Sequence, residues 1–366
     1  MSNIVINGRF LGQALTGVQC FALDYTRYLI KKNDKVIIVS PPGARGSAPN
    51  DIKPYVVEFG FCSGHIWEQF LLPIFLYLNG NPLLLCFCGL PPVLYKNKIF
   101  TIHDMSIYHC RDWFNPYYLF IYRAGYYFAS KGSASILTVS DFSKSEIHRY
   151  LHVPLSKIVV LYNAISHPLS SVCQHASVSD AEEQRVASFF SSEAFNLVTV
   201  SSIEPRKNLL RLISVVNDLN SRGYKIRLIV VGKSHGTFRT VKFSEESIVG
   251  GSIVFTDYIS DLQLDYVFRN MDGFVYASLY EGFGRPPLEA MFYNKPMAVS
   301  GNTCIPEVIG DCNGVLYLDP NKDADIYDKI KQMVCDGRNQ CFDYSSILGK
   351  YHISITCKSL DKVLNP

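Results

Sequence analysis

The segment at residues 280–291 constrains the fold of this chain more than any other stretch. It reads Tyr-Glu-Gly-Phe-Gly-Arg-Pro-Pro-Leu-Glu-Ala-Met and follows a short apolar run at residues 273–277, which predicts a buried strand. The two prolines suit the first turn of a helix, because N–H groups there have no partner within the helix. A strand, a glycine loop and a helix start make up a βα unit, so the segment predicts an α/β fold.

Two carboxylates and two glycines give this loop its chemical character. Glu281 is expected at the carboxyl end of the strand, and Glu289 in the first turns of the helix. Gly282 and Gly284 would let the backbone approach a ligand closely. We expect the amides near Leu288 and Glu289 to be open to a phosphate. Carboxylates bind sugar hydroxyls, so the loop suits a sugar joined to a diphosphate. An ordinary βα turn with an acidic helix start is the alternative.

The twelve residues together resemble the Glu-x7-Glu signature of the retaining nucleotide-sugar glycosyltransferases of glycosyltransferase family 4, which have the GT-B fold. The resemblance implies two Rossmann-like domains that face each other across a cleft. It also implies that Glu289 would bind the ribose hydroxyls, that Glu281 would bind hydroxyls of the donor sugar, and that the anomeric configuration is retained.

A second segment resembles the same family. An apolar run at residues 196–201 predicts a strand, and Glu-Pro-Arg-Lys-Asn follows it at residues 204–208. By resemblance to the family's phosphate-binding segment, Arg206 and Lys207 would hold the diphosphate, where positive charge stabilises the leaving group. Ser202 stands where the family often has glycine. A surface Arg-Lys pair is the alternative.

Three further positions follow from the resemblance. Thr-Gly-Val-Gln at residues 16–19 is similar to a loop that lies over the cleft near the diphosphate, with Gly17 against the ligand. His103, at the end of an expected strand, would reach the donor sugar, and Asp104 would help to hold the acceptor; a capping pair is the alternative. The segment at residues 257–262 resembles the loop that flanks the nucleotide base.

The residues of the expected site therefore fall into two sets, one catalytic and one that binds the donor. The catalytic residues are His103, Glu281, Arg206 and Lys207. The residues expected to bind the donor are Gly17, Ser202, Arg206, Lys207, Tyr258, Ile259, Gly282, Phe283, Gly284, Pro287, Leu288 and Glu289. We assign no cofactor, because the nucleotide-sugar is a co-substrate, and no metal, because helix capping explains the Asp-Ala-Asp at residues 323–325.

Length predicts the division of the chain. At 366 residues it exceeds what one hydrophobic core serves, so we expect two domains of roughly 150 residues or more. We place an acceptor-side domain at residues 1–167, with a C-terminal helix at 352–366 packing back on it. A nucleotide-sugar-binding domain follows at 185–345, after a serine-rich linker within 167–184.

Composition limits the partners and the compartment. A net charge of +3 is too small to indicate nucleic acid. Eleven cysteines without a Cys-x-x-Cys pair, and a start without a basic leader, favour the cytoplasm. Prolines and glycines interrupt the apolar residues 71–94, so no membrane span is expected. The aromatic and basic stretch at residues 112–131 is typical of a core helix, but such a helix can also lie on the inner membrane near a lipid-linked acceptor.

The resemblance as a whole indicates bacterial O-antigen or surface polysaccharide synthesis, with GDP-mannose or a related donor and a lipid-linked oligosaccharide acceptor. A nucleotide-sugar-binding protein of the same fold without catalysis is the alternative. A dehydrogenase would need Gly-x-Gly-x-x-Gly after a strand, and neither half of the chain supplies it.

Overall fold

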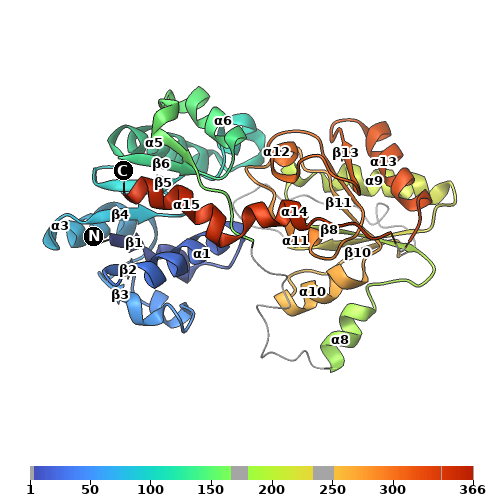
Figure 1. The fold of residues 1–366 in the computed structure, drawn as a ribbon, viewed down its shortest axis with the longest axis horizontal. Helices are drawn as coiled ribbons and strands as arrows, with labels where there is room; N and C mark the ends of the chain where they lie inside the picture. The colour runs from blue at the N-terminus through green and yellow to red at the C-terminus, as the bar shows by residue number, and fades with distance from the viewer. Residues whose placement is uncertain (1–3, 166–179, 234–250, 339, 366) are drawn as a thin grey trace. The chain divides into compact units, whose positions relative to one another are not determined.

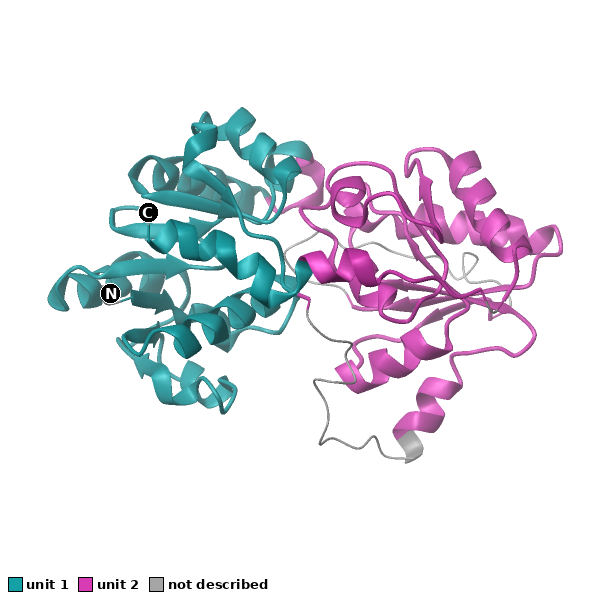
Figure 2. Ribbon diagram, viewed as in Figure 1, with its two compact units in different colours: residues 1–109, 116–164, 351–366 teal, residues 110–115, 165–350 magenta. Residues whose placement is uncertain are grey.

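Two parallel β-sheets organise the chain. The computed structural model describes residues 4–165, 180–233, 251–338 and 340–365. Unit 1 comprises residues 1–109, 116–164 and 351–366, and unit 2 comprises residues 110–115 and 165–350 (Figure 2). Each unit is a parallel sheet with helices packed against it (Figure 1). The predicted α/β class with two Rossmann-like domains is therefore confirmed.

Unit 1 has a seven-stranded sheet in the order β3-β2-β1-β4-β5-β6-β7. Its strands are β1 (Ile4–Asn7), β2 (Val36–Ser40), β3 (Val56–Glu58), β4 (Leu83–Cys86), β5 (Lys98–Thr101), β6 (Ser135–Thr138) and β7 (Ile158–Val160). Its helices are α1 (Gly17–Lys32), α2 (Gly64–Ile66), α3 (Leu72–Leu78), α4 (Ser106–His109), α5 (Pro116–Gly132), α6 (Asp141–Leu151) and α15 (Ile353–Leu364).

The order of the strands creates a topological switch point in unit 1. In the parallel register, Ile4 of β1 lies beside Val36 of β2 on one side and Leu83 of β4 on the other. The chain thus builds the sheet outward from β1 in one direction and then from β4 in the other. Ligands of such sheets bind at the carboxyl ends of the strands where the direction reverses, which is between β1 and β4.

The C-terminal helix α15 belongs to unit 1. The Tyr28 hydroxyl on α1 donates to an Asp361 carboxylate oxygen at 2.7 Å, and the Lys32 ammonium lies 2.6 Å from the same carboxylate. Cys357 and Leu360 of α15 are buried. The last helix therefore adds both apolar packing and polar contacts to the first unit of the chain.

Unit 2 has a six-stranded sheet in the order β10-β9-β8-β11-β12-β13, with its own switch point between β8 and β11. Its strands are β8 (Phe195–Val200), β9 (Ile226–Val231), β10 (Ile253–Phe255), β11 (Gly273–Tyr276), β12 (Met297–Ser300) and β13 (Val315–Leu318). Its helices are α8 (Asp180–Ala187), α9 (Leu209–Ser221), α10 (Asp261–Asn270), α11 (Arg285–Met291), α12 (Ile305–Ile309), α13 (Asp323–Cys335) and α14 (Ser345–Leu348).

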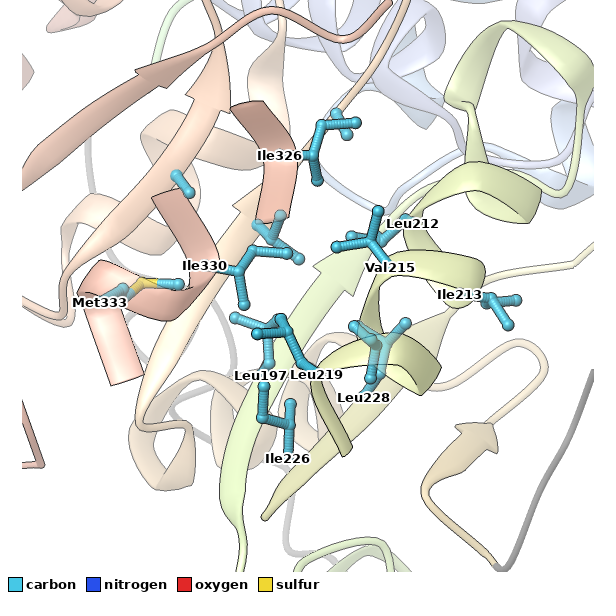
Figure 3. Packing of buried hydrophobic residues seen from close by; sticks show 14 of the residues in the cluster. Leu197, Leu212, Ile213, Val215, Leu219, Ile226, Leu228, Ile326, Ile330 and Met333 are labelled. Atoms are coloured by element: carbon cyan, nitrogen blue, oxygen red, sulfur yellow. The ribbon is translucent and has the colours of Figure 1, made fainter. Parts of the chain in front are cut away.

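Apolar side chains of α9 and α13 cover one face of this sheet. Figure 3 shows Leu212, Val215 and Leu219 of α9 together with Ile326 and Ile330 of α13 over the strands. These positions recur at helical spacing in α9, as the sequence predicts, so one stripe of the helix is buried while the opposite side stays in solvent. The core fixes α9, and with it the turn that precedes α9.

Several local predictions need correction. Strand β13 was not predicted, although its sequence, Val-Leu-Tyr-Leu, is an apolar run as long as β11. Ser260 caps α10, since its hydroxyl oxygen accepts from the Gln263 amide. Ser140 likewise caps α6, since its side chain accepts from the Ser143 amide. Helix α8 begins at Asp180, within the expected linker, and residues 167–179 of that linker lie outside the described residues.

The packing of α9 gives a matched pair of substitutions. Leu219 is fully buried and Leu210, on the same helix, is 50% exposed. We expect Leu219→Ala to lower the free energy of unfolding by about 2–5 kcal/mol, because it leaves a cavity. Leu210→Ala should change it by no more than about 0.5 kcal/mol. Urea unfolding followed by circular dichroism measures both, and equal losses would contradict the assigned burial.

Candidate functional site

A cluster of charged side chains lies at the switch point of unit 2. Arg206 and Lys207 are in the 3-10 turn η7 (Pro205–Lys207), between β8 and α9. Glu281 is in the loop between β11 and α11. Because β8 and β11 are neighbouring parallel strands, the loops that follow them meet at one edge of the sheet. Three of the four predicted catalytic residues are therefore brought together here.

The side chains of Lys207, Tyr276, Arg206 and Ser278 all bond to Glu281. The Lys207 ammonium donates to Glu281 Oε1 at 2.6 Å and to the Tyr276 hydroxyl oxygen at 2.9 Å. The Tyr276 hydroxyl donates to the same Oε1 at 2.8 Å. Arg206 Nη1 donates to Glu281 Oε2 at 2.9 Å. The carboxylate orientation is therefore fixed from both of its oxygens.

A second carboxylate completes the cluster. Glu204 is fully buried, and its Oε1 lies 2.6 Å from Arg206 Nε. Two carboxylates thus face two cations, and Lys207 and Glu281 are both less than a tenth exposed. The cluster carries no net formal charge, and this pairing of opposite charges offsets part of the free energy lost when they are buried.

Sequence reasoning missed Glu204 and Tyr276. Glu204 is the first residue of the Glu-Pro-Arg-Lys-Asn string from which Arg206 was predicted, so the sequence alone could have indicated it as a site residue. Tyr276 is the last residue of β11, and its apolar neighbours made it look like core. Only the structure shows that its hydroxyl reaches Glu281.

The cluster shifts the ionisation of its members. Burial alone would raise the pKa of Glu281, but the charges of Lys207 and Arg206 outweigh it and lower this pKa to about 2. Burial, followed by repulsion from Arg206, lowers the pKa of Lys207, while Glu281 opposes that change. Burial and then Glu281 raise the pKa of Tyr276 well above its usual range. At neutral pH Glu281 is therefore an anion that accepts hydrogen bonds and not a general acid.

The start of α11 differs from the expectation. Gly284 precedes α11 with φ of +83°, and a Cβ atom there would meet Ile305 Cδ1 at 2.4 Å, so the position requires glycine. Pro286 and Pro287 have no amide hydrogen. Leu288 is fully buried, so the open amide that we expected there is not found.

Glu289 lies on α11 beside Arg285, whose Nε is 2.6 Å from Glu289 Oε1. Both side chains remain partly exposed. Among the other predicted donor-binding residues of unit 2, Tyr258 is 63% exposed and Ser202 is half-buried, whereas Ile259, Gly282, Phe283 and Pro287 are buried. Arg285 was not predicted, although its spacing of four residues from Glu289 was visible in the sequence.

His103 and Gly17 belong to unit 1. His103 Nε2 donates to the Phe87 carbonyl at 2.8 Å, which leaves Nδ1 as the acceptor of the neutral ring. Burial lowers the pKa of His103, so the ring is neutral at pH 7. Asp104 Oδ1 accepts from the Ser106 amide at 2.9 Å and orders the start of α4. Gly17 is the exposed first residue of α1.

The aspartates of the Asp-Ala-Asp string are engaged locally. Asp323 pairs with Arg211 at 2.6 Å, and Asp325 accepts from the Asp319 amide at 2.5 Å. In the described ranges, no group of three or more His, Cys, Asp or Glu side chains could hold a metal ion. Within the same ranges, no helix combines the length and the apolar character needed to cross a bilayer.

The low pKa of Glu281 predicts how acid affects stability. Its folded-state pKa of about 2 lies below its ordinary value of 4.5, so its contribution is present above about pH 4.5 and is lost as the pH falls towards 2. The shift corresponds to about 3 kcal/mol. Glu281→Gln has no such titration.

The difference in unfolding free energy between the wild type and Glu281→Gln should therefore shrink from about pH 6 to about pH 3. Urea unfolding at a series of pH values measures it. A difference that stays constant over this range would show that Glu281 is not paired as described.

Residues 180–346 match the family described as "Glycosyl transferases group 1". The chain is 31% identical over 229 residues to "O-antigen chain mannosyltransferase B" of Escherichia coli, an alignment that covers 62% of this chain and 58% of that protein. It is 25% identical over 272 residues to "O-antigen chain mannosyltransferase RfbU" of Salmonella typhimurium, which covers 74% of this chain and 70% of that protein. The match with the first of these spans little more than half of the relative's length.

Solved structures agree on the fold. The Anabaena protein HepE, in complex with UDP and glucose, superposes with a TM-score of 0.71 at 13% identity and covers 100% of both chains. At this identity the likeness concerns the fold alone, which is the GT-B pair of Rossmann-like domains. Residues 180–346 thus match the model of the glycosyl transferases group 1 family, within a chain that has the GT-B fold.

Proposed function

We propose that the chain is a retaining glycosyltransferase that moves a sugar from a nucleotide-sugar donor to a glycan acceptor in the synthesis of O-antigen or a related surface polysaccharide. The observation that carries the proposal is the buried cluster of Arg206, Lys207 and Glu281 at the switch point of unit 2. The names of the relatives, which are mannosyltransferases of O-antigen chains, support mannose as the transferred sugar, and we propose GDP-mannose or a related donor. Retention follows from the family resemblance.

The chemistry assigned to Arg206 and Lys207 is stabilisation of the leaving nucleoside diphosphate. Negative charge grows on the diphosphate as the glycosidic bond breaks, and cations already held in place stabilise it without reorganisation. Arg206 is the more exposed of the two, so its guanidinium contacts the phosphates and Lys207 acts from behind it. Glu204 and Glu281 keep both cations in position before the donor arrives.

The hydrogen bonds that Glu281 already accepts limit how it could bind the donor sugar. A carboxylate oxygen accepts about two hydrogen bonds. Oε1 already accepts from Lys207 and Tyr276, whereas Oε2 accepts from Arg206. A sugar hydroxyl would therefore donate to Oε2. Glu289, partly exposed beside Arg285, is the proposed partner of the ribose hydroxyls.

We also propose a peripheral contact of unit 1 with the inner membrane, close to a lipid-linked acceptor. Helix α5 contains no acidic residue and presents exposed aromatic side chains at Tyr117, Phe120 and Phe128. The Lys131 ammonium lies over the Tyr127 ring at 4.1 Å on the same helix. Aromatic side chains combined with lysine suit the interface of an anionic bilayer. Tyr118, Tyr122 and Tyr126 are half-buried, which explains why the stretch reads partly as core.

Removal of the Arg206 cation should lower turnover, and because it also leaves the buried Glu204 carboxylate without its partner, circular dichroism at the assay temperature must show that the variant is folded. We expect Arg206→Ala to reduce kcat by roughly 100-fold to 1000-fold, because a charge that stabilises the leaving group is lost. Arg211→Ala, which removes the ion pair with Asp323 and the hydrogen bond to the Pro320 carbonyl, is the matched control and should keep full activity. Release of GDP from GDP-mannose in the presence of acceptor measures both.

A chain that binds GDP-mannose in a thermal-shift assay but transfers sugar to no acceptor would favour the alternative, a non-catalytic nucleotide-sugar-binding protein. Equal activity of Arg206→Ala and Arg211→Ala would remove Arg206 from its proposed role.

The membrane contact predicts the behaviour of a double variant. Phe120→Ala with Phe128→Ala removes two exposed aromatic side chains from α5 and should lower the affinity for anionic phospholipid vesicles by roughly tenfold or more. Leu210→Ala, which removes an exposed apolar side chain from unit 2, should leave it unchanged. Vesicle flotation measures the bound fraction, and equal binding of all three proteins would contradict the assignment.

A further inference from the structure

The helical segment at residues 64–78 of unit 1 is apolar on two opposite sides. It runs through α2, the π-helical turn η4 (Trp67–Leu71) and α3 without a break, because Ile66 and Leu71 at the two junctions both have helical backbone angles. Its inner side is part of the core of unit 1, through Trp67, Leu72, Phe75 and Leu76. Its outer side carries five large apolar side chains, each between 48% and 75% exposed: Ile66, Phe70, Ile74, Tyr77 and Leu78. A helix that is apolar on all sides is normally buried on all sides.

The five exposed side chains form one stripe, which we call the 66–78 stripe. Ile66, Phe70 and Ile74 follow one another at intervals of four residues, and Tyr77 and Leu78 come three and four residues after Ile74. Residues three or four apart are neighbours on a helix surface, so the stripe is continuous along the segment. Soluble monomers rarely expose a continuous apolar patch of more than a few hundred Å².

The size of the stripe suits a stable protein interface. An aromatic side chain buries roughly 150–250 Å² when it is fully covered, so five large side chains that are about half exposed or more offer on the order of 600 Å². A stable complex buries about 800 Å² on each partner. Exposed, uncharged polar residues at the two ends of the segment, Ser63, Asn79 and Asn81, extend the surface and provide the polar rim that such interfaces have.

The absence of charge decides which kind of partner fits. Residues 61–82 contain no lysine, arginine or aspartate, and their one glutamate, Glu68, is fully buried and bonded to Arg9. An anionic bilayer attracts a surface through lysine and arginine. Helix α5 has such a cation, Lys131 over the Tyr127 ring, whereas the stripe has none. Aromatic side chains without charged neighbours are typical of the central part of a protein–protein interface.

A second copy of this chain meets these requirements. In a two-fold symmetric dimer both copies use the same surface, so each charged side chain of an interface would lie near its own like charge. The stripe has no charge to repel its copy. A straight helical segment of 15 residues is about 22 Å long and can pack against an identical segment by ridges into grooves. The inner side is already fixed in the core, so the outer side is available without rearrangement.

We propose that residues 64–78 form the interface of a homodimer, in which the 66–78 stripe of one copy packs against the 66–78 stripe of a second copy. Phe70, Tyr77 and Leu78 are the most exposed aromatic and aliphatic side chains of its central and C-terminal turns, and the second copy covers them. The proposal concerns assembly and is independent of the reaction proposed for the cluster of unit 2.

The test measures the mass of the full chain by sedimentation over a range of concentrations. The wild type should be a dimer that dissociates on dilution. Phe70→Glu places two like charges in the apolar interface and should raise the Kd of the dimer by roughly 30-fold or more, the change expected at an interface hot spot. Phe120→Glu is the matched control, because Phe120 is 74% exposed on α5 of the same unit, and it should leave the Kd unchanged.

Tyr77→Glu repeats the test at a second position, where the side chain is 59% exposed, and circular dichroism shows which variants are folded. A wild type that is monomeric at every concentration, or folded Phe70→Glu and Tyr77→Glu variants that dimerise as tightly as the wild type, would overturn the proposal. Loss of the dimer in Phe120→Glu would overturn it as well, since the interface would then involve α5. A monomeric wild type whose binding to phospholipid vesicles falls in Phe70→Ala would assign the stripe to a lipid surface instead.

Discussion

The contact between the Lys207 ammonium and the Glu281 carboxylate is the interaction on which the site of unit 2 depends. Each ion loses several kcal/mol of hydration when it is buried, and only close pairing with further hydrogen bonds offsets this. The partners follow two different strands, β8 and β11, which are joined in the parallel register that sets Gly273 beside Leu197. A shift of that register would separate the two charges. The sheet and the site therefore both require the same register between β8 and β11.

Stability alone does not explain such a cluster, because apolar side chains of the same volume would fill the space at similar or lower free energy. What the charges provide is orientation. Glu204 and Glu281 hold Arg206 from two sides, and the low pKa of Glu281 keeps it ionised throughout the neutral range. A guanidinium fixed in this way faces an incoming anion without rearrangement, which is the property that stabilisation of a leaving group requires.

The sequence predicted which strands and residues form this site better than it predicted the contacts between them. Buried parallel strands are short apolar runs, so β8 and β11 were found to within a residue or two. Arg206, Lys207 and Glu281 were chosen because they follow such runs in strings that resemble a known family. The bond from Tyr276 to Glu281 and the burial of Leu288 could not be predicted, since both depend on which loops meet in space. Strand β13 was missed although its apolar run, Val-Leu-Tyr-Leu, has the same length as β11, so the sequence could have indicated it.

The two units place charged side chains at the same edge of their sheets, but in different combinations. Each places a buried glutamate and an arginine at the carboxyl edge where its sheet changes direction: Glu68 with Arg9 in unit 1, and Glu281 with Arg206 in unit 2. In unit 1 the arginine is balanced by one carboxylate, and His65 Nδ1 lies 3.3 Å from its Nη1. In unit 2 a second cation, Lys207, and a second carboxylate, Glu204, join the arginine, so the charge there is shared among four side chains. Two units of the same fold class thus place different numbers of charged side chains at the same edge of the sheet, because the fold sets the edge and the residues placed there set its chemistry.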